Sequence, residues 1–332
     1  MSDSIRAKIT AVGHFLPEHR LTNHDLEQMV ETDDEWIRTR TGIEERRILK
    51  DPDKASAFMA TKAAEEILAN RGIDADEVDA IIVATVTPDY LFPATACLVQ
   101  KHLGASNAFG YDLSAACSGF LFGLTTAANM IEAGRAEKVL LIGSDKMSSI
   151  VDYEDRTTCI LFGDAAAGVL LEPSDDETGI IDYLQYTDGD LECALYQPAG
   201  GSRHPATQET VAGKKHYIKQ DGRTVFKKAT EGMADVSLEV MEKNNLSADE
   251  VAWLVPHQAN KRIIDATARR MGLSSEKVMI NIDKYGNTTA ATIPLCLYDW
   301  KDKMNYGDNI ILSAFGGGYT WGAVYVKWGI EG

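Results

Sequence analysis

The chain lacks several features that would assign it to a specialised class of protein. No apolar run reaches the roughly 18 residues of a membrane-spanning helix, and no basic segment followed by an apolar one opens the sequence, as a secretory signal would. The cysteines are scattered and form no C-x-x-C pair. We therefore expect a cytoplasmic protein with no disulfide framework, zinc site or membrane contact. The cysteines are Cys97, Cys117, Cys159, Cys193 and Cys296.

Positive charge is also scarce, and it is unevenly distributed. The 332 residues include 33 Lys and Arg against 50 Asp and Glu, a net charge of -17 at pH 7. Such a balance disfavours nucleic acid as a partner. The spacings of seven and one residues place Arg262, Arg269 and Arg270 on one side of a helical stretch. This basic cluster indicates an anionic ligand or an acidic partner protein, although solvated surface charge is the plainer interpretation.

An imperfect internal repeat is the main organising feature of the sequence. Residues 63–85 and 236–258 share the letters ADEV, which fixes an offset of 173 residues (248 − 75). Residues 161–169 and 314–322 form a second match in the same order, each a glycine-rich turn leading into a last strand. Two matches in one order favour duplication. We predict two halves, at 1–173 and 174–332.

Each half alternates apolar strands with amphipathic helices, one of them at 118–133. Alternation of this kind predicts mostly parallel sheets covered by helices. Ligands of such folds bind beyond the carboxyl ends of the strands, so the residues that follow the strands are candidates for a site. The expected strands lie at 5–12, 80–86, 109–113, 139–143, 251–255, 278–282 and 310–314.

Three polar residues follow expected strands. Cys117 precedes an apolar helix, whose start would favour a thiolate nucleophile. His257 and Asn287 stand at strand-to-helix junctions of the second half, where Asn287 takes the place that Cys117 has in the first. A pseudo-twofold axis would bring the three to one centre. Taken singly, they could equally be a small buried cysteine, a structural histidine and a turn asparagine.

Four motifs around these residues resemble one known family. They are SAACSGF around Cys117, VPHQANKRII around His257, YGNTTAA around Asn287, and AFGGGYTWG near the end of the chain. Together they resemble β-ketoacyl-acyl carrier protein synthase III, within the thiolase-like superfamily, and the likeness includes residues 34–37 and 40–43. The resemblance implies an α/β fold of duplicated βαβαβαββ halves in five αβαβα layers.

The resemblance also implies a Cys-His-Asn condensing enzyme that starts type II fatty-acid synthesis. The Cys117 thiolate would take an acyl group from a short or branched acyl-CoA, and the backbone N–H groups of Cys117 and Gly317 would form the oxyanion hole. Malonyl-acyl carrier protein would then lose CO₂. His257 and Asn287 would hold its enolate, which attacks the acyl-enzyme to give 3-oxoacyl-carrier protein. No metal or cofactor is implied beyond the CoA thioester substrate.

The remaining residues implied by the resemblance bind substrates and partners. Trp36 and Arg156 would enclose the CoA adenine, and Arg40 would lie near the phosphates. Phe92 would enter the acyl pocket of a partner subunit in a homodimer. The passage to the sulfur would be lined by Phe226, Asn260 and Phe315. The acidic carrier protein would be bound by Arg262, Arg269 and Arg270.

Two departures from the family pattern affect substrate recognition. Thr157 follows Arg156 where the family often has glycine, and a β-branched residue is disfavoured at positive φ, so the CoA contact is expected to differ. Residues 200–222 are polar and hard to match, and they would lie near the acyl pocket. The sequence therefore leaves the identity of the primer acyl group open.

Three other functions fit parts of the pattern. The same trio occurs in condensing enzymes that make quinolones or polyketides, and pocket shape would separate these from a fatty-acid enzyme. The order of Cys117, His257 and Asn287 loosely matches a papain-type hydrolase, but the local Cys-Gly-x-Cys-Trp signature is missing. A non-catalytic protein that binds CoA or a carrier protein is the third alternative, and an intact trio disfavours it.

Overall fold

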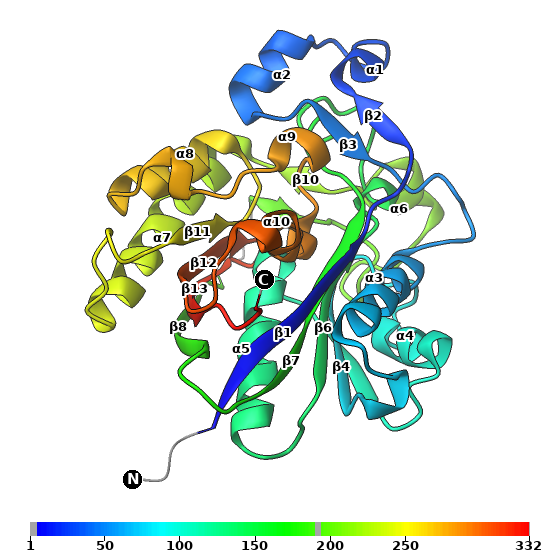
Figure 1. Ribbon diagram of the computed structural model, residues 1–332. Helices are drawn as coiled ribbons and strands as arrows, with labels where there is room; N and C mark the ends of the chain where they lie inside the picture. The colour runs from blue at the N-terminus through cyan, green and yellow to red at the C-terminus, as the bar shows by residue number, and fades with distance from the viewer. Residues whose placement is uncertain (1–4, 190–193, 332) are drawn as a thin grey trace.

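The computed structural model describes residues 5–189 and 194–331, and its strands form two main sheets (Figure 1). The first sheet has the order β1-β7-β6-β4-β5, and the second has the order β11-β12-β13-β8. Two small two-stranded sheets, β2-β3 and β9-β10, lie apart from these. The strands are β1 (Arg6–Phe15), β2 (Arg20–Thr22), β3 (Glu45–Arg47), β4 (Ala80–Ala84), β5 (Phe109–Leu113), β6 (Val139–Asp145), β7 (Ala165–Ser174), β8 (Gly179–Thr187), β9 (Leu195–Tyr196), β10 (Lys219–Gln220), β11 (Trp253–Pro256), β12 (Asn309–Gly316) and β13 (Thr320–Lys327).

Helices cover both sheets and fill the space between them. Helices α3 (Ser56–Arg71) and α4 (Thr95–Leu103) pack on the outer face of the first sheet. Helices α5 (Gly119–Glu132) and α10 (Thr292–Trp300) lie between the sheets. Helices α7 (Gly222–Lys243) and α8 (Lys261–Arg270) cover the second sheet (Figure 1). The result is the expected αβαβα order of five layers. The short helices are α1 (Asn23–Glu27), α2 (Asp34–Thr41), α6 (Gln208–Ala212) and α9 (Ile282–Tyr285).

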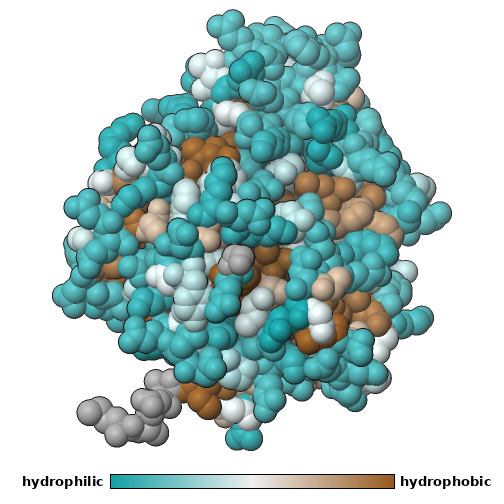
Figure 2. All heavy atoms as spheres, in the orientation of Figure 1, coloured by the Kyte–Doolittle hydropathy of each residue, from teal (hydrophilic) through white to brown (hydrophobic). Residues whose placement is uncertain are grey.

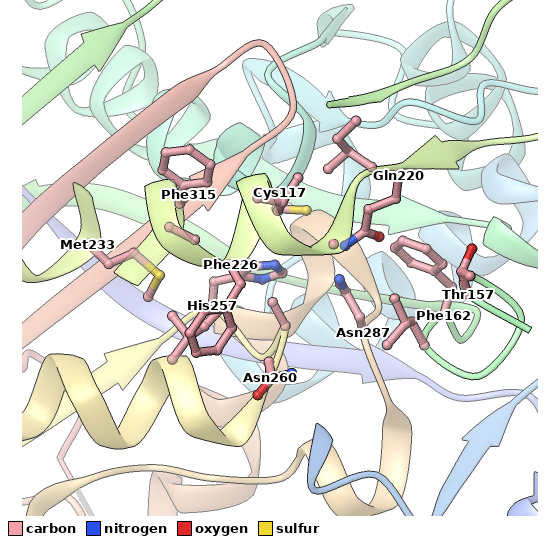
Figure 3. A pocket seen from close by; sticks show the side chains of 17 residues that line it. Cys117, Thr157, Phe162, Gln220, Phe226, Met233, His257, Asn260, Asn287 and Phe315 are labelled. Atoms are coloured by element: carbon pink, nitrogen blue, oxygen red, sulfur yellow. The ribbon is translucent and has the colours of Figure 1, made fainter. Parts of the chain in front are cut away.

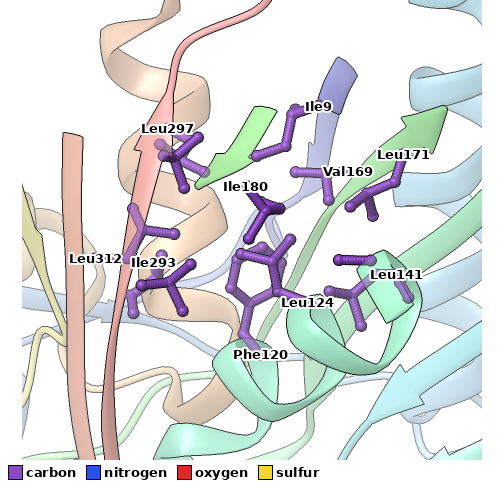
Figure 4. Packing of buried hydrophobic residues seen from close by; sticks show 14 of the residues in the cluster. Ile9, Phe120, Leu124, Leu141, Val169, Leu171, Ile180, Ile293, Leu297 and Leu312 are labelled. Carbon is purple, nitrogen blue, oxygen red and sulfur yellow. The ribbon is translucent and has the colours of Figure 1, made fainter. Parts of the chain in front are cut away.

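The largest hydrophobic core lies in the middle layer. Phe120 and Leu124 of α5 pack with Ile293 and Leu297 of α10, between the inner faces of the two sheets (Figure 4). Every residue of β4 and of β6 is buried, which is why β4 and residues 139–142 of β6 are continuously apolar rather than alternating. Burial of each such leucine, isoleucine or phenylalanine contributes about 1.5–3 kcal/mol. This packing fixes the strand ends on which the site depends.

The repeat seen in the sequence is present in the topology. Strands β8, β13, β12 and β11 occupy in the second sheet the places of β1, β7, β6 and β4 in the first. The two central helices each follow a 3₁₀ turn, η2 (Ala116–Ser118) and η5 (Thr289–Ala291), and these turns begin 173 residues apart (289 − 116). Duplication is therefore confirmed. The division at residue 173 stays a prediction and falls one residue before the end of β7.

One expected strand is not formed. At 278–282 the structure has a single parallel bridge between Val278 and Leu254, in the position beside β11 that β5 has beside β4. The pairing stops because the N–H of Asn281 donates to the side-chain Oε1 of Gln258 at 3.1 Å, and α9 begins at the next residue. The other expected strands lie within a few residues of the observed ones.

The face of the molecule seen in Figure 2 is mostly hydrophilic, and hydrophobic residues reach it in separate patches. None of the helices within residues 5–189 and 194–331 is long and apolar enough to cross a membrane. In the same residues, no group of three or more His, Cys, Asp or Glu side chains is placed to hold a metal ion. Four cysteines in these ranges carry free thiols, and Cys193 lies outside them.

Candidate active site

Cys117 lies in the η2 turn between β5 and α5, at the carboxyl end of its strand as expected. Ala116 before it has φ +48°, which turns the chain sharply. A hairpin of the second sheet holds this turn in place. The Ser118 hydroxyl donates to the carbonyl of Thr320 at 2.8 Å, and the Thr320 hydroxyl donates to the carbonyl of Ala115 at 2.9 Å. Cys117 is therefore positioned by both halves of the chain.

Burial acts against ionisation of the Cys117 thiol. The side chain is 6% exposed, and burial, followed by the charge of Asp145, raises the pKa of Cys117 to about 12. This effect opposes the thiolate that the helix start was expected to favour. A helix terminus stabilises a charge by about 0.3–1 kcal/mol, and α5 begins only at Gly119. Loss of solvation outweighs that contribution.

His257 follows β11 and precedes α8, as predicted. Its backbone N–H donates to the carbonyl of Ser313 at 2.8 Å. Its ring Nδ1 lies 2.7 Å from the Thr292 hydroxyl, which leaves Nε2 for the cavity. The ring is 1% exposed, and burial lowers the pKa of His257 to about 3, so the imidazole is neutral near pH 7.

Asn287 lies between α9 and η5, so it does not follow a strand as expected. At the offset of 173 residues it corresponds to Ser114, and the counterpart of Cys117 is Ala290. The Asn287 Oδ1 accepts a hydrogen bond from the N–H of Thr289 at 2.9 Å. This bond fixes the amide and leaves its NH₂ group directed into the cavity (Figure 3).

The structure brings the three predicted residues together. Cys117, His257 and Asn287 line one cavity of about 180 Å³, and their side chains surround the same space (Figure 3). A second cavity of about 390 Å³ also reaches Cys117. Its wall is largely apolar, and Gly317 forms part of it, as expected for a residue near the sulfur. The apolar wall residues include Val86, Met147, Ile150 and Ile218.

Phe226, Asn260 and Phe315 line the first cavity, where they were expected. Asn260 caps the start of α8, since its Oδ1 accepts from the N–H of Arg262 at 2.9 Å. Its amide nitrogen donates to the backbone carbonyl of Arg40, also at 2.9 Å. Asn260 thus joins the cavity wall to α2. The Arg40 side chain itself is exposed and is not among the residues that line the cavity.

Trp36 and Arg156 face each other, as the CoA prediction requires. The Arg156 guanidinium carbon lies 5.4 Å from the centre of the Trp36 ring. A flat ring between them would need about 7 Å, two contacts of roughly 3.5 Å, so one side chain must move on binding. Thr157 has no positive φ, and the conformational objection to it was wrong. Its N–H and hydroxyl bind Asp155, at 3.0 and 2.6 Å.

The residues expected to meet partners lie on the surface. Phe92 is 87% exposed and does not reach the described cavities of its own chain. The three arginines all lie on α8, and the side chains of two of them contact residues of α7. Arg262 stacks on the ring of Phe226 at 4.8 Å, and Arg270 forms an ion pair with Asp235 at 2.6 Å. Arg269 is exposed.

Sequence reasoning missed several residues around the trio. Asp145 ends β6, so the rule that points to the carboxyl ends of strands could have found it. Thr289 and Thr292 carried no signal beyond their place near Asn287 in the chain. Leu195 borders both cavities and lies in a stretch with no clear periodicity. Ile218 and Gln220 show that the unmatched segment 200–222 contributes to both walls.

Comparisons with known proteins agree with this arrangement. Models described as 3-oxoacyl-[acyl-carrier-protein (ACP)] synthase III and its C-terminal part match residues 111–189 and 241–328. A β-ketoacyl-[acyl-carrier-protein] synthase III of Chlorobaculum tepidum is 57% identical over 98% of this chain and 100% of its own. The crystal structure of 3-oxoacyl-[acyl-carrier-protein] synthase III from Aquifex aeolicus superposes with TM-score 0.89 at 45% identity, covering 97% of this chain and all of the other. The priming β-ketosynthase of the R1128 polyketide pathway is more distant, at 30% identity and TM-score 0.90 over 97% and 96% of the two chains.

Fold and site together define a thiolase-like condensing enzyme. The relatives identify the family within this class, because their sequence identity to this chain extends over nearly the full length of both chains. The chain belongs to the β-ketoacyl-[acyl-carrier-protein] synthase III family, the acyltransferases that initiate fatty-acid synthesis. The hydrolase interpretation is therefore set aside, and the polyketide interpretation is the less favoured one.

Proposed function

We propose that Cys117 carries the acyl group during the reaction. The sulfur attacks the thioester carbonyl of an acyl-CoA, a C–S bond forms to Cys117, and the bond to the CoA sulfur breaks. The thiol proton leaves with CoA. The N–H groups of Cys117 and Gly317 would hold the oxyanion of the tetrahedral intermediate. The observation that carries this proposal is the position of Cys117 between the cavity that also holds His257 and Asn287 and a second, largely apolar cavity.

The second half of the reaction uses His257 and Asn287. Malonyl-acyl carrier protein enters, its carboxylate carbon leaves as CO₂, and the bonding electrons form an enolate. His257 and Asn287 hold the enolate oxygen while its carbon attacks the acyl-Cys117 carbonyl. The product is 3-oxoacyl-carrier protein, and Cys117 leaves as a thiolate that takes a proton from solvent. Support comes from the shared cavity and from the fixed orientation of both side chains.

The second cavity would receive the acyl chain of the primer. Its apolar wall suits a hydrocarbon, and Ile218 from the segment 200–222 forms part of it. Trp36 and Arg156 would bind the CoA adenine at the outer end of the first cavity, with Arg40 near the phosphates. The arginines of α8 would bind the acidic carrier protein. We further propose a homodimer, in which Phe92 enters the acyl pocket of the other subunit, and a cytoplasmic location.

Intact-protein mass spectrometry after mixing with acyl-CoAs tests the proposal. The panel runs from acetyl-CoA to octanoyl-CoA with branched four- and five-carbon members, and Cys117→Ala is the control. We expect a gain of one acyl group that is lost in the variant, and the best substrate identifies the primer. Absence of any adduct from both acyl-CoA and acyl-carrier protein would contradict the assignment of Cys117.

The two half-reactions separate the remaining roles. We expect His257→Ala and Asn287→Ala to keep self-acylation of Cys117 but to lose condensation, by about 10²–10³-fold for each lost donor. Condensation is measured as 3-oxoacyl-carrier protein formed from malonyl-carrier protein. Full condensation by His257→Ala would show that its assigned role is wrong.

A further inference from the structure

One buried residue, Thr289, connects the two side chains that hold the enolate. Its backbone N–H donates to Oδ1 of Asn287 at 2.9 Å. Its backbone carbonyl accepts from the Thr292 hydroxyl at 3.1 Å, and that hydroxyl lies 2.7 Å from Nδ1 of His257. Thr289 and Thr292 are 2% and 1% exposed, so water does not compete for these bonds. A displacement of Thr289 would therefore disturb His257 and Asn287 together.

Thr289 adopts a backbone conformation that needs support. Its φ is +53°, which is rare for a β-branched residue. Its hydroxyl donates to Oδ2 of Asp145. Because the Asp145 side chain is fully buried, this bond ties the turn to the protein interior and supports the conformation of Thr289.

Asp145 is itself fixed by the first sheet. Its Oδ1 accepts from the hydroxyls of Thr85 and Thr87, at 3.0 and 2.8 Å, and from the N–H groups of Val86 and Thr87, at 2.8 and 3.1 Å. These donors come from the end of β4 and the turn that follows it. Asp145 is fully buried at the end of β6. It therefore ties the η5 turn of the second half to two strand ends of the first.

The Thr292 hydroxyl also limits how the ring of His257 can be protonated. While it donates to Thr289, its oxygen can accept from Nδ1–H; when it donates instead to a bare Nδ1, the ring proton lies on Nε2. Only the second arrangement lets the ring donate to an enolate oxygen. Serine can satisfy both arrangements, and valine satisfies neither.

We propose that Thr292 is a positioning residue for His257, and that Thr289, anchored by Asp145, aligns Thr292 and Asn287 as one unit. This inference rests on the proposed function, which gives His257 and Asn287 their roles in condensation. It predicts that the half-reaction of the enolate depends on Thr292 and Thr289. Transfer of the acyl group to Cys117 depends on them much less.

The kinetic test compares Thr292→Val with Thr292→Ser. We expect Thr292→Val to lower condensation by roughly 10²-fold, the scale of a misplaced catalytic group, with self-acylation of Cys117 within a few-fold of normal. Thr292→Ser should recover most of the loss. Thr61→Val is the matched control, since Thr61 is 5% exposed and its hydroxyl donates within α3, to the carbonyl of Ala57. Equal condensation by Thr292→Val and the unmodified protein would overturn the proposal.

A second variant tests the coupling through Thr289. Thr289→Val removes the bond to Asp145 and should lower condensation in the otherwise unmodified protein. The same change should have little further effect in a His257→Ala, Asn287→Ala background. If Thr289→Val lowered condensation by the same factor in that background as in the otherwise unmodified protein, the proposed common positioning unit would be contradicted.

A spectroscopic measurement tests the contact between Thr292 and His257 directly. Nitrogen-15 NMR of ¹⁵N-histidine-labelled protein, assigned with His257→Gln, should show one dominant ring tautomer of His257. Loss of this signature in Thr292→Val and its return in Thr292→Ser would support the proposal. The same tautomer in Thr292→Val and in the unmodified protein would contradict it. Failure of the proposed function is distinguished separately, by full condensation in His257→Ala.

Discussion

At the scale of single residues, Gly316 allows the second sheet to approach the η2 turn and Cys117 closely. A Cβ atom placed on Gly316 would lie 2.7 Å from the backbone nitrogen of Cys117 and 3.0 Å from that of Ser118. Both are backbone atoms, so relief would require the η2 turn or the β12–β13 hairpin to move. The proposed oxyanion hole uses these same two segments, through the N–H groups of Cys117 and Gly317.

We therefore predict that Gly316→Ala slows acylation of Cys117 at least tenfold. Overpacking of this kind typically destabilises a protein by about 1–3 kcal/mol, so the thermal unfolding temperature should fall as well. Gly201→Ala is the control, because a Cβ there meets no atom within 4 Å and its φ is not positive. Mass spectrometry of the acyl-enzyme and a thermal melt give both readouts. Unchanged acylation in Gly316→Ala would show that acylation of Cys117 does not depend on the close approach of the β12–β13 hairpin to the η2 turn.

The residues that could be predicted from the sequence are those within continuous motifs. Cys117 and Asn287 lie in stretches of small residues with a glycine, His257 directly follows an apolar strand, and these patterns are local. Their hydrogen-bond partners could not be predicted in the same way. Asp145 meets Thr289 across 144 residues, and this contact depends on how the two halves pack. The same packing raises the pKa of Cys117, which the helix-start argument did not anticipate.

At the scale of secondary structure, α8 combines a buried apolar face with an exposed basic one. Ile263, Ile264 and Ala268 pack inward, while Arg262, Arg269 and Arg270 remain outside. The charge of Arg270 is partly compensated by Asp235, and Arg262 is held on a ring of α7. Arg269 is thus the arginine of α8 best placed to bind an acidic carrier protein.

We predict that Arg269→Glu raises the KM for malonyl-acyl carrier protein roughly two- to tenfold, from the 0.2–1 kcal/mol of an exposed ion pair with the sign reversed. Arg270→Glu should have a smaller effect. The change should shrink with added salt, and acylation by acyl-CoA should be unaltered. Lys62→Glu on α3, in the outer layer of the first sheet, is the control (Figure 1). An equal rise in KM for Lys62→Glu would mean that overall charge, rather than α8, decides carrier binding.

The bounds of helices and strands could be predicted where the hydrophobic pattern of the sequence matches the burial of the same residues in the structure. The strands expected at 80–86 and 139–143 have continuous apolar runs, and the buried strands β4 and β6 are found there. The strand expected at 278–282 failed because one glutamine side chain takes a backbone N–H that a strand would use. Helix α6 and strand β10, within 200–222, were not predicted because the segment is polar and lacks a period. Strand β10 pairs with β9, and its Gln220 lines the first cavity, so its position depends on the packing of distant segments.

At the scale of the whole molecule, the loop after β4 exposes large apolar side chains that no contact within the described residues of the single chain covers. Tyr90, Leu91 and Phe92 are consecutive, and they are 60%, 86% and 87% exposed. Large apolar side chains gathered in this way mark interaction surfaces. Val86, at the start of the same loop, lines the apolar cavity beside Cys117. A second subunit that covers the loop could therefore also contribute to the acyl pocket.

We predict that the protein sediments with about twice the 36.3 kDa mass of its chain, and that Phe92→Asp shifts it to the mass of one chain at micromolar concentration. A buried, unpaired carboxylate is strongly disfavoured, so the interface should lose affinity by several orders of magnitude. Met29→Asp is the control, because Met29 is 49% exposed on another part of the surface. If Phe92 of one subunit closes the acyl pocket of the other, Phe92→Asp should also change which acyl-CoA best acylates Cys117. A variant that stays dimeric and keeps its acyl preference would place the interface elsewhere and leave the pocket complete within one chain.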